Sequence, residues 1–242
     1  MQKTEFALEF EKVKENGGGI PVVIVAAGNA SRMKGQDKQM AELCGIPVIV
    51  RTLRAFENCP EISEITVVTK EEKIADIQNL GNRYAVSKLK NIIVGGSCRA
   101  ESVMKGVALY KGRANKVLTH DGARPLVNNT VIRNVINALN DFGSVTCAVR
   151  INDTVKRVNA EGIATETVNR EGLVSIQTPQ GVDTEIFLNT CQNSDLSIFT
   201  DDTSVMEYAG LKTKIVEGHA DNIKITTPED MAKAENILKK EW

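Results

Sequence analysis

Short apolar runs alternate along the chain with longer stretches whose apolar residues recur at helical spacing. The runs are rich in Val and Ile and predict strands at 22–25, 65–68, 91–94, 116–118 and 145–149. The stretches between them predict helices at 47–56, 100–110 and 129–140. Strands and helices in alternation are typical of a sheet covered on both faces. The pattern therefore predicts an α/β fold with a mostly parallel sheet in three layers.

After Val149 the pattern changes to period two. Residues 153–158 and 165–168 alternate polar and apolar positions on either side of a turn that contains Gly162, which predicts a β-hairpin. Its charged side chains make this hairpin too polar for a core, so we expect it to project as an arm at about 150–173. Further elements are predicted as helices at 184–190 and 202–209 and a strand at 214–216.

Both ends of the chain carry recognisable patterns. Thr227, Pro228 and Asp230 stand in the order of a helix N-cap, a first helical proline and a capping acid, which predicts a C-terminal helix. The N-terminal residues show a short amphipathic helical pattern and then three consecutive glycines, which predict a hinge. We therefore expect an N-terminal extension at 1–19 and one domain at 20–242.

Composition narrows the classes of function. Of the 242 residues, 42% are hydrophobic and 25% are charged, and the net charge is −1. This balance argues against nucleic acid or an anionic membrane as a partner, so any recognition of anions has to be local. No apolar run reaches the roughly 18 residues of a membrane span, and the N-terminus is too polar for a signal peptide. Five scattered cysteines without CxxC pairs predict a cytoplasmic setting, with no disulfide framework or zinc site.

The first predicted strand runs into a loop of glycine and positive charge, AAGNASRMKGQDKQ at 26–39. It has neither the pattern of a P-loop nor the GxGxxG of a dinucleotide site. Backbone N–H groups around Gly28, together with Arg32 and Lys38, could hold a triphosphate by hydrogen bonds and charge. Basic residues on a loop are more often solvated surface, so this loop alone does not establish a site.

A second polar stretch follows the strand at 91–94. Gly95 and Gly96 would let the backbone approach a flat ligand closely, and Ser102 offers a hydroxyl to a base or a ribose. The alternative is an ordinary turn into a helix with Ser97 as its N-cap.

Two further polar stretches lie at predicted strand ends. Asp121 is placed to hold a divalent cation, and Arg124 can meet an anion, while the neighbouring His120 is expected to be structural. Asp221 and Lys224 flank an alternating pattern that predicts another strand. Ligands of open α/β sheets bind at the carboxyl ends of the strands, so these groups are candidates for one site.

Taken in order, these stretches form a longer pattern. It comprises Ala26-Ala-Gly28 with Arg32 and Lys38-Gln39, Gly95-Gly96 with Arg99 and Ser102, His120-Asp-Gly-Ala-Arg-Pro125, Asp153-Thr154 with Lys156-Arg157, Thr167-Val-Asn-Arg170, Gln177-Thr-Pro-Gln180, Thr200-Asp-Asp202 with Glu207-Tyr208, and Glu217-Gly with Asp221-Asn-Ile-Lys-Ile-Thr226. From about residue 21 to 238 the chain resembles the 2-C-methyl-D-erythritol 4-phosphate cytidylyltransferase family of the non-mevalonate isoprenoid route.

The resemblance implies a Rossmann-like nucleotidyltransferase fold and a homodimer held by exchange of the projecting hairpin. It implies transfer of CMP from CTP to 2-C-methyl-D-erythritol 4-phosphate, with pyrophosphate as the other product. Its implied catalytic residues are Arg32, Lys38 and Lys224, and its implied nucleotide-binding residues are Ala26, Ala27, Gly28, Gly95, Gly96, Arg99 and Ser102. Mg²⁺ or another divalent cation would bind Asp121 and Asp221. The polyol phosphate would bind Arg124, Thr154, Lys224 and, from the partner's arm, Arg170 and Thr178.

The chain departs from the family at three positions. Ser97 stands where an acid usually follows the paired glycines, Asp37 where proline often precedes the loop lysine, and Asn169 where Asp commonly precedes the arm arginine. These departures bear on base recognition and on the arm, and they leave the phosphate-binding groups intact.

Two other functions are compatible with the pattern. One is a pentitol-phosphate cytidylyltransferase that acts on ribitol 5-phosphate by the same chemistry. The other is a regulatory nucleotide-binding module without catalysis, which should lack the metal acid or the loop lysine, whereas Asp121 and Lys38 are both present. Cytidylyl transfer joins two anions, so it needs positioning and positive charge rather than a Ser/His or Cys/His nucleophile pair.

Overall fold

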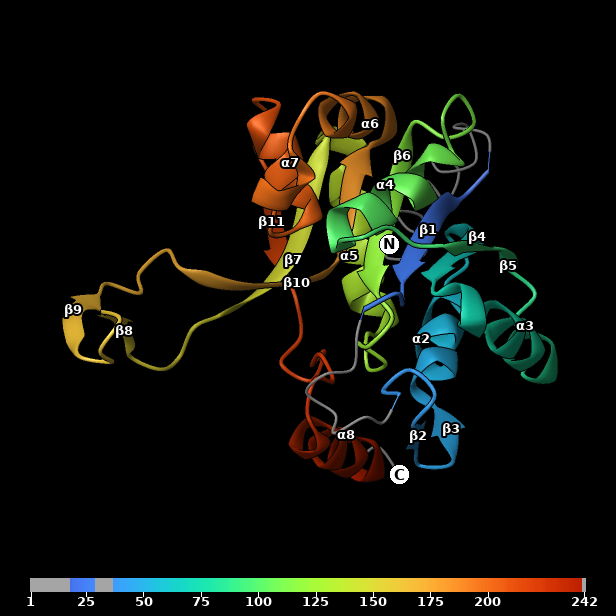
Figure 1. Cartoon of the computed structure of the whole chain (residues 1–242), viewed down its shortest axis with the longest axis horizontal. Helices are drawn as coiled ribbons and strands as arrows, with labels where there is room; N and C mark the ends of the chain where they lie inside the picture. The colour runs from blue at the N-terminus through green and yellow to red at the C-terminus, as the bar shows by residue number, and fades with distance from the viewer. Residues whose placement is uncertain (1–17, 29–36, 241–242) are drawn as a thin grey trace, which may run out of the picture.

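The centre of the fold is a seven-stranded sheet in the order β11-β7-β10-β6-β1-β4-β5, seen in a computed structural model that describes residues 18–28 and 37–240 (Figure 1). The strands are β1 (Ile20–Val25), β4 (Ile62–Thr69), β5 (Leu89–Val94), β6 (Lys116–Asp121), β7 (Ser144–Arg150), β10 (Val174–Asp183) and β11 (Lys214–Glu217). All neighbouring pairs are parallel except those of β10, which runs antiparallel to β6 and β7.

Helices cover both faces of this sheet. One layer holds α2 (Val48–Glu57), α3 (Ile74–Arg83) and α5 (Asn129–Asp141), and the other holds α4 (Arg99–Ala108), α6 (Thr184–Gln192) and α7 (Asp202–Tyr208). Strand β1 shows why both faces are filled, because successive side chains of a strand point to opposite sides. Val22 and Ile24 pack into the α2 and α5 layer, and Val23 packs into the α4 and α6 layer.

A smaller apolar cluster lies below the sheet. Helix α8 (Pro228–Lys240) packs near the short strands β2 (Glu42–Leu43) and β3 (Ile46–Pro47), and buries Ala234 against Leu43 and Ile225. The described residues also form two 3-10 turns, η2 (Glu71–Lys73) and η3 (Leu196–Ile198). No helix within residues 18–28 and 37–240 is both long enough and apolar enough to cross a membrane.

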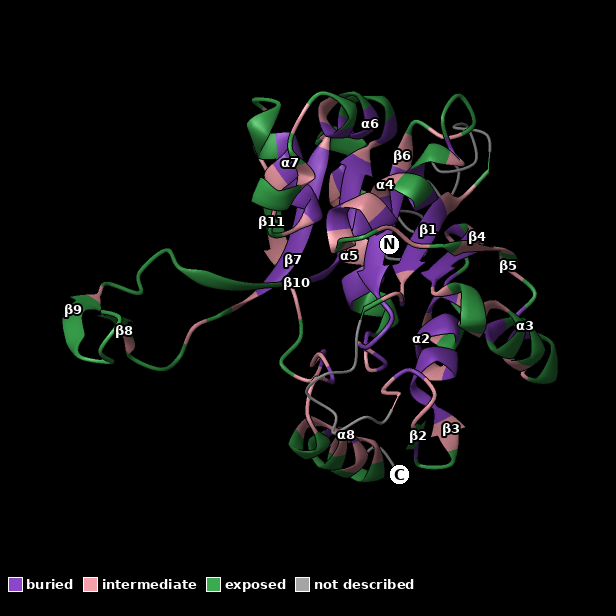
Figure 2. Cartoon of the chain, viewed as in Figure 1, coloured by how far each residue is buried: buried purple, intermediate pink, exposed green. Residues whose placement is uncertain are grey.

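The arm predicted from period two is present. Strands β8 (Val155–Val158) and β9 (Ala164–Val168) pair antiparallel, and Gly162 in their turn has a φ of 78°, which favours glycine. Figures 1 and 2 show this hairpin extending far from the sheet with an almost wholly exposed surface. Two of its apolar side chains find little cover in their own chain, since Val158 and Ile163 are each 58% exposed.

Strand β10 contains extra residues at the base of the arm. Its pairing with β7 steps from Ile176↔Ala148 to Gln180↔Thr146, so β10 advances by four residues while β7 advances by two. Such a bulge re-aims side chains next to functional sites. The residues that it displaces from the regular ladder are Gln177, Thr178 and Pro179.

The structure confirms most of the elements predicted from the sequence. The early strands and helices occur as predicted, and α8 begins with reciprocal capping, in which Thr227 Oγ1 accepts from the Asp230 N–H at 3.3 Å and the Asp230 carboxylate accepts from the Thr227 N–H at 2.9 Å. The strand predicted around Asp221 to Lys224 is wrong, because this segment is an irregular loop. The predicted N-terminal helix lies outside the described residues.

Gly106 of α4 marks the closest approach of a helix to the sheet. A Cβ atom there would lie 2.4 Å from Val23 Cγ1 and 2.9 Å from Val68 Cγ2, both fully buried.

In Gly106→Ala, helix propensity favours alanine by about 1 kcal/mol. Overpacking against two stiff valines costs about 1–3 kcal/mol, and so short a contact lies at the upper end. We expect a net loss of about 2 kcal/mol in urea unfolding. The exposed control Ala108→Ser should change stability by no more than about 0.5 kcal/mol, and a Gly106→Ala protein as stable as wild type would contradict the packing argument.

Candidate active site

The loops after β1, β5 and β6 are joined at the carboxyl edge of the sheet. The Ala26 N–H donates to Val68 O at 2.7 Å, the Gly95 N–H to Thr69 O at 2.7 Å, and the Gly122 N–H to Val25 O at 2.9 Å. Parallel strands bring these loops together because all their carboxyl ends face one way. The candidate residues that follow β1, β5 and β6 therefore share one edge, as predicted.

The two glycine-containing loops are in direct contact. A Cβ atom on Gly95 would lie 2.7 Å from the Ala27 Cβ and 2.9 Å from Ser102 Oγ, so only glycine fits. Gly28 ends this described stretch, and Arg32 lies outside the described residues. Lys38 is described and precedes the buried Gln39, whose Oε1 would lie 3.1 Å from a Cβ on Gly122.

The turn at Gly96 is fixed by hydrogen bonds from the start of α4. The Gly96 N–H donates to Ser102 Oγ at 2.9 Å, and the Ser97 N–H and hydroxyl both donate to Glu101 Oε2 at 2.7 Å. The Ser97 contacts lower the pKa of Glu101 to about 2. Cys98 rather than Ser97 is the N-cap of α4, with its Sγ accepting from the Glu101 N–H. Ser102 thus shapes the loop that would meet the nucleotide.

Three cations converge on the carboxylate of Asp121. Lys224 Nζ lies 2.8 Å from Oδ2, Arg124 Nε lies 3.4 Å from Oδ2, and Arg99 Nε lies 3.4 Å from Oδ1. Asp121 is buried, which alone would raise its pKa. The charges of Arg99, Lys224 and Arg124 outweigh burial and hold the pKa of this carboxyl well below its usual range. Asp121 is therefore ionised throughout the physiological range.

Arg99 is held by a second, more deeply buried carboxylate. Its Nη1 and Nη2 atoms donate to Asp202 Oδ1 at 2.8 Å and Oδ2 at 2.9 Å, a bidentate pair. Asp202 is 1% exposed and also accepts from Thr119 Oγ1 at 2.6 Å, and its N–H donates to Gln180 Oε1. The guanidinium predicted to bind nucleotide is thus shared between two carboxylates, and it links α4 to α7.

The bulge of β10 meets His120 and Asp121. Thr178 Oγ1 accepts from the Asp121 N–H at 3.1 Å and lies 2.9 Å from His120 Nδ1, while His120 Nε2 lies 3.2 Å from Arg124 O. The ring also packs edge-on against Phe56. Burial lowers the pKa of His120 from 6.5 to about 3, so the imidazole is neutral.

The loop that carries Lys224 is anchored on the same bulge. Asn222 is fully buried, and its Nδ2 donates to Thr178 O at 2.8 Å and to Gln177 Oε1 at 3.3 Å. Its main-chain carbonyl accepts from Arg124 Nη1 at 2.8 Å. The side chain of Gln177 also pairs with the loop backbone, since its Nε2 donates to His219 O at 3.0 Å and its Oε1 accepts from the His219 N–H at 3.3 Å. These contacts replace the ladder of the strand predicted here.

These groups line a cavity of about 420 Å³. Its walls are Arg99, Asp121, Arg124, Thr146, Ile176, Gln177, Thr178, Gln180, Thr200, Asp201, Thr203, Ser204, Glu207, Thr213, Ile215 and Lys224. Three cations gather at one part of this lining, and many of the remaining residues carry hydroxyls. A cavity of this kind suits a small molecule that combines an anionic group with several hydroxyl groups.

Five predicted site residues line the cavity: Arg99, Asp121, Arg124, Thr178 and Lys224. The prediction that Thr178 comes from a partner's arm is wrong, because β10 places it in the cavity of its own chain. Thr154 and Arg170 are exposed on the arm and do not line that cavity. Asp221 is half exposed, 3.8 Å from His219 Nδ1, and is also absent from the lining.

Sequence reasoning assigned no role to Gln177, Gln180 or Asp202. Gln177 and Gln180 line the cavity, and Asp202 lies behind it and holds Arg99. They belong to the stretches Gln177-Thr-Pro-Gln180 and Thr200-Asp-Asp202, so the pattern contained them. The sequence could not show that Asp202 pairs with Arg99, because the two residues are 103 positions apart in the chain.

Asp121 is the side chain of the cavity wall best suited to a divalent cation. Among the described residues no three His, Cys, Asp or Glu side chains are grouped to hold a metal ion. Mg²⁺, however, is usually held by one or two carboxylates together with substrate phosphates and water. The ionised carboxylate of Asp121 on the cavity wall fits that mode of binding.

Comparisons with known proteins agree with this geometry. The family model for 2-C-methyl-D-erythritol 4-phosphate cytidylyltransferase matches residues 20–240. The enzyme of that name from Clostridium acetobutylicum is 39% identical over 90% of this chain and 96% of its own, and that of Dehalococcoides mccartyi is 41% identical over 91% and 96%. The crystal structure of 4-diphosphocytidyl-2C-methyl-D-erythritol synthase from Anaerococcus prevotii is similar with a TM-score of 0.79, at 31% identity over 92% of this chain and 99% of that one.

The buried pair between Arg99 and Asp202 should contribute strongly to stability. Asp202→Asn keeps the shape of the side chain but leaves the Arg99 guanidinium with half of its charge partners. Removing one partner of a buried pair costs about 3–5 kcal/mol. Arg99 retains Asp121 and its side chain is 30% exposed, so we expect a loss of about 2–3 kcal/mol by urea unfolding.

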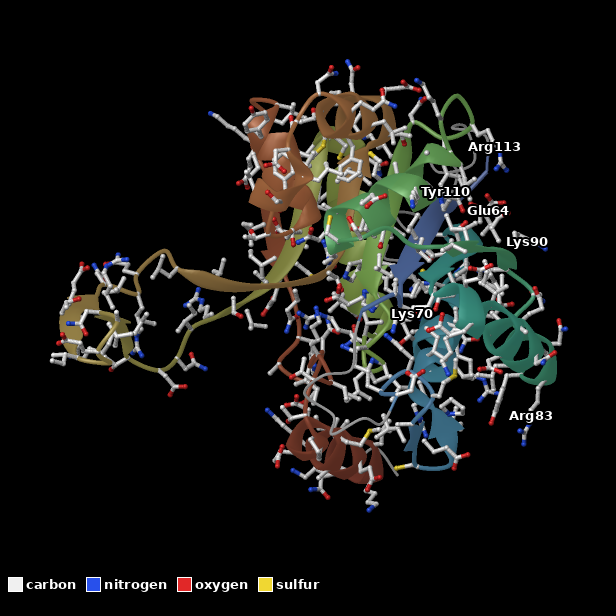
Figure 3. All side chains as sticks on the ribbon, viewed as in Figure 1. Glu64, Lys70, Arg83, Lys90, Tyr110 and Arg113 are labelled. Atoms are coloured by element: carbon white, nitrogen blue, oxygen red, sulfur yellow. The ribbon has the colours of Figure 1, made fainter. Side chains whose placement is uncertain are left out.

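The matched control is Glu64→Gln, which removes an ion pair at the surface. Glu64 lies 3.4 Å from Arg113, whose side chain is 60% exposed, and Figure 3 shows both on the side of the molecule away from the arm. Exposed pairs are worth about 0–1 kcal/mol. Equal losses in the two variants would contradict the structural role assigned to Asp202.

Proposed function

The chain belongs to the 2-C-methyl-D-erythritol 4-phosphate cytidylyltransferase family, and on that premise we propose how its glycine loops and its cavity divide the two substrates between them. The enzyme transfers CMP from CTP to 2-C-methyl-D-erythritol 4-phosphate in isoprenoid precursor biosynthesis. The relatives carry the name of this activity, and they give no support to the ribitol 5-phosphate alternative.

In our proposal CTP lies along the glycine loops. The base and ribose meet the backbone at Gly95 and Gly96, and the triphosphate meets the loop from Ala26 to Lys38, with Arg32 and Lys38 as its cations. The close contact between Ala27 and Gly95 supports this assignment, because it makes one continuous surface of two loops. Ser102 and Arg99 act behind that surface, through Gly96 and Asp121 respectively.

Methylerythritol phosphate occupies the cavity in this proposal. Its phosphate lies against Arg124 and Lys224, and its hydroxyl groups face the hydroxyl-bearing wall that includes Thr178, Thr200 and Ser204. The observation that carries the proposal is the meeting of three cations with a single carboxylate, Asp121, at one part of a cavity otherwise rich in hydroxyls.

The reaction needs little acid–base chemistry. A phosphate oxygen of methylerythritol phosphate attacks the α-phosphorus of CTP, a new P–O bond forms, and the bond to the leaving pyrophosphate breaks. Negative charge grows on the α-phosphate oxygens and on pyrophosphate. Lys224 and Arg124 hold the nucleophile, and Arg32 and Lys38 neutralise the triphosphate.

We propose that Asp121 holds Mg²⁺ or another divalent cation, with Asp221 as the second candidate ligand. When bound, the ion neutralises charge on the phosphate oxygens. Asp121 needs no proton loss before it can bind a cation, because its neighbours keep it ionised. Lys224, Arg124 and Arg99 then remain close enough to the same carboxylate to contact anionic oxygens around the ion.

We propose a homodimer in which the arms are exchanged. Thr154 and Arg170 cannot serve the cavity of their own chain, because both are exposed on a hairpin that projects from it (Figure 1). A two-fold axis would carry each arm to the other chain's cavity and would cover its exposed apolar residues. We also propose a cytoplasmic location, which suits five free cysteines.

The direct test of function is pyrophosphate release by purified enzyme with CTP and Mg²⁺, with methylerythritol phosphate and ribitol 5-phosphate offered separately. Lys224→Ala should lower the turnover number by about 10²–10³, the usual effect of losing one charge donor in the transition state, while the KM for CTP changes little. Lys233→Ala, at an exposed position on α8, is the control and should retain full turnover. Near-normal turnover of Lys224→Ala would remove Lys224 from the catalytic groups.

The arm exchange can be tested by mixing inactive variants. Lys224→Ala damages the cavity, and Arg170→Ala damages the arm. In a mixed dimer one cavity receives both lesions and the other receives none, so random subunit exchange should restore about a quarter of wild-type activity.

The control mixture combines Lys224→Ala with Arg124→Ala. Both lesions lie in the cavity of their own chain, so every site in a mixed dimer carries one of them and activity stays low. If the Lys224→Ala and Arg170→Ala mixture also stayed inactive after proven exchange, the arm would act within its own chain.

A further inference from the structure

His120 lies behind the cavity wall and contacts two residues that line it. The side chain is fully buried, and its ring centroid lies 4.8 Å from that of Phe56. Nδ1 lies 2.9 Å from Thr178 Oγ1, and Nε2 lies 3.2 Å from Arg124 O. One imidazole therefore joins the hydroxyl of β10 to the backbone of the loop that carries Arg124.

The partners of the ring decide where its hydrogen lies. A carbonyl oxygen can only accept, so Nε2 carries the hydrogen and donates to Arg124 O. Thr178 Oγ1 already accepts from the Asp121 N–H at 3.1 Å, and its own hydrogen needs an acceptor in a buried setting. Nδ1 is that acceptor. Hydrogen on Nδ1 alone would turn the lone pair of Nε2 toward the Arg124 carbonyl oxygen, so that neither atom could donate. Hydrogen on both nitrogens would bury an imidazolium against Phe56.

We propose that His120 is a positioning residue that fixes the direction of the Thr178 hydroxyl. With its hydrogen committed to Nδ1 and one lone pair to Asp121 N–H, Thr178 Oγ1 offers the cavity only its second lone pair. Thr178 thus faces the substrate as a hydrogen-bond acceptor.

This polarity determines how a substrate can lie in the cavity. An ionised phosphate has only acceptor oxygens, so it is excluded from Thr178 and drawn to Arg124 and Lys224. A hydroxyl group can donate, and it is the group that Thr178 accepts. The inference rests on the assignment of the cavity to a polyol phosphate and sets the orientation of that ligand.

The first test is made on the wild-type enzyme. Its only two histidines are His120 and His219, and the latter is half exposed, so a His219→Gln control assigns the ¹⁵N signals. Long-range ¹H–¹⁵N correlation should show His120 as the neutral tautomer with hydrogen on Nε2. Hydrogen on Nδ1, or on both nitrogens, would overturn the proposal.

The second test uses two amide substitutions of opposite effect. His120→Asn can keep an acceptor near the Nδ1 position but loses contact with Arg124, and His120→Gln can keep a donor near Nε2 but loses the acceptor for Thr178. We expect His120→Gln to raise the KM for methylerythritol phosphate about tenfold, the worth of one hydrogen bond, with the KM for CTP unchanged. His120→Asn should raise it less. The reverse order, or equal rises in both KM values, would contradict a role through Thr178.

A Thr178→Val background checks that the effect passes through the hydroxyl. In that background, His120→Gln should cause no further rise in the KM for methylerythritol phosphate. A Thr178→Ser enzyme, which keeps the hydroxyl, should bind this substrate better than Thr178→Val does. If His120 variants fail to fold, Thr178→Val, Thr178→Ser and the wild-type tautomer still decide the question. An enzyme with normal turnover and the opposite tautomer refutes this inference alone. An enzyme that releases no pyrophosphate with methylerythritol phosphate refutes the proposed function, even with the expected tautomer.

Discussion

The carboxylate of Asp121 is shared by three cations that come from separate segments of the chain. Without it, Arg99, Arg124 and Lys224 would repel one another, and two like charges about 4 Å apart cost about 4 kcal/mol at an effective dielectric of 20. Asp202 offsets a second part of this charge through Arg99. Three cations against two carboxylates leave one net positive charge. The two carboxylates therefore keep the cluster assembled before an anion binds. The remaining positive charge still attracts that anion.

Much of the fold follows from local patterns. Strand β1 could be recognised because a central parallel strand is buried on both faces and reads as an unbroken apolar run. Strand β10 could not, because its buried positions include Gln177, Thr178 and Gln180, whose polar side chains hide the period-two pattern. Gln177 holds the loop of Asn222, Thr178 contacts His120 and the Asp121 N–H, and Gln180 holds the start of α7. Such long-range contacts leave no local signature.

The candidate site was predictable to a similar degree. Residues at the carboxyl ends of the parallel strands were placed correctly, since topology alone brings Ala27, Gly95 and Asp121 to one edge. Thr178 was assigned to the arm instead of the cavity because the bulge that re-aims it depends on pairing with β7. The Arg99–Asp202 pair needed the packing of α4 near α7.

Each departure from the family pattern is balanced by a nearby contact. Asp37 Oδ1 accepts from the Gln39 N–H at 2.9 Å and its Oδ2 lies 3.2 Å from Lys73, which restrains the loop where a proline would limit the backbone. Ser97 donates to Glu101, so a carboxylate still lies beside the paired glycines. Asn169 accepts from the Glu171 N–H at 3.0 Å and so turns the chain at Arg170. The side chains present in this protein thus each restrain the backbone near the position of the departure.

The cavity wall and the arm, which follow one another in the chain at β10, differ in how much change of sequence length they can accept. Inserting or deleting one residue in a regular strand exchanges its two faces. An insertion near Gln180 would therefore move the side chains of β10 that line the cavity to the opposite face of the sheet. The hairpin tip at Gly162 is exposed and far from that wall, and tips of this kind tolerate insertions and deletions. The tip of the arm can therefore change in length or charge without disturbing the cavity, whereas the cavity residues of β10 depend on a fixed register.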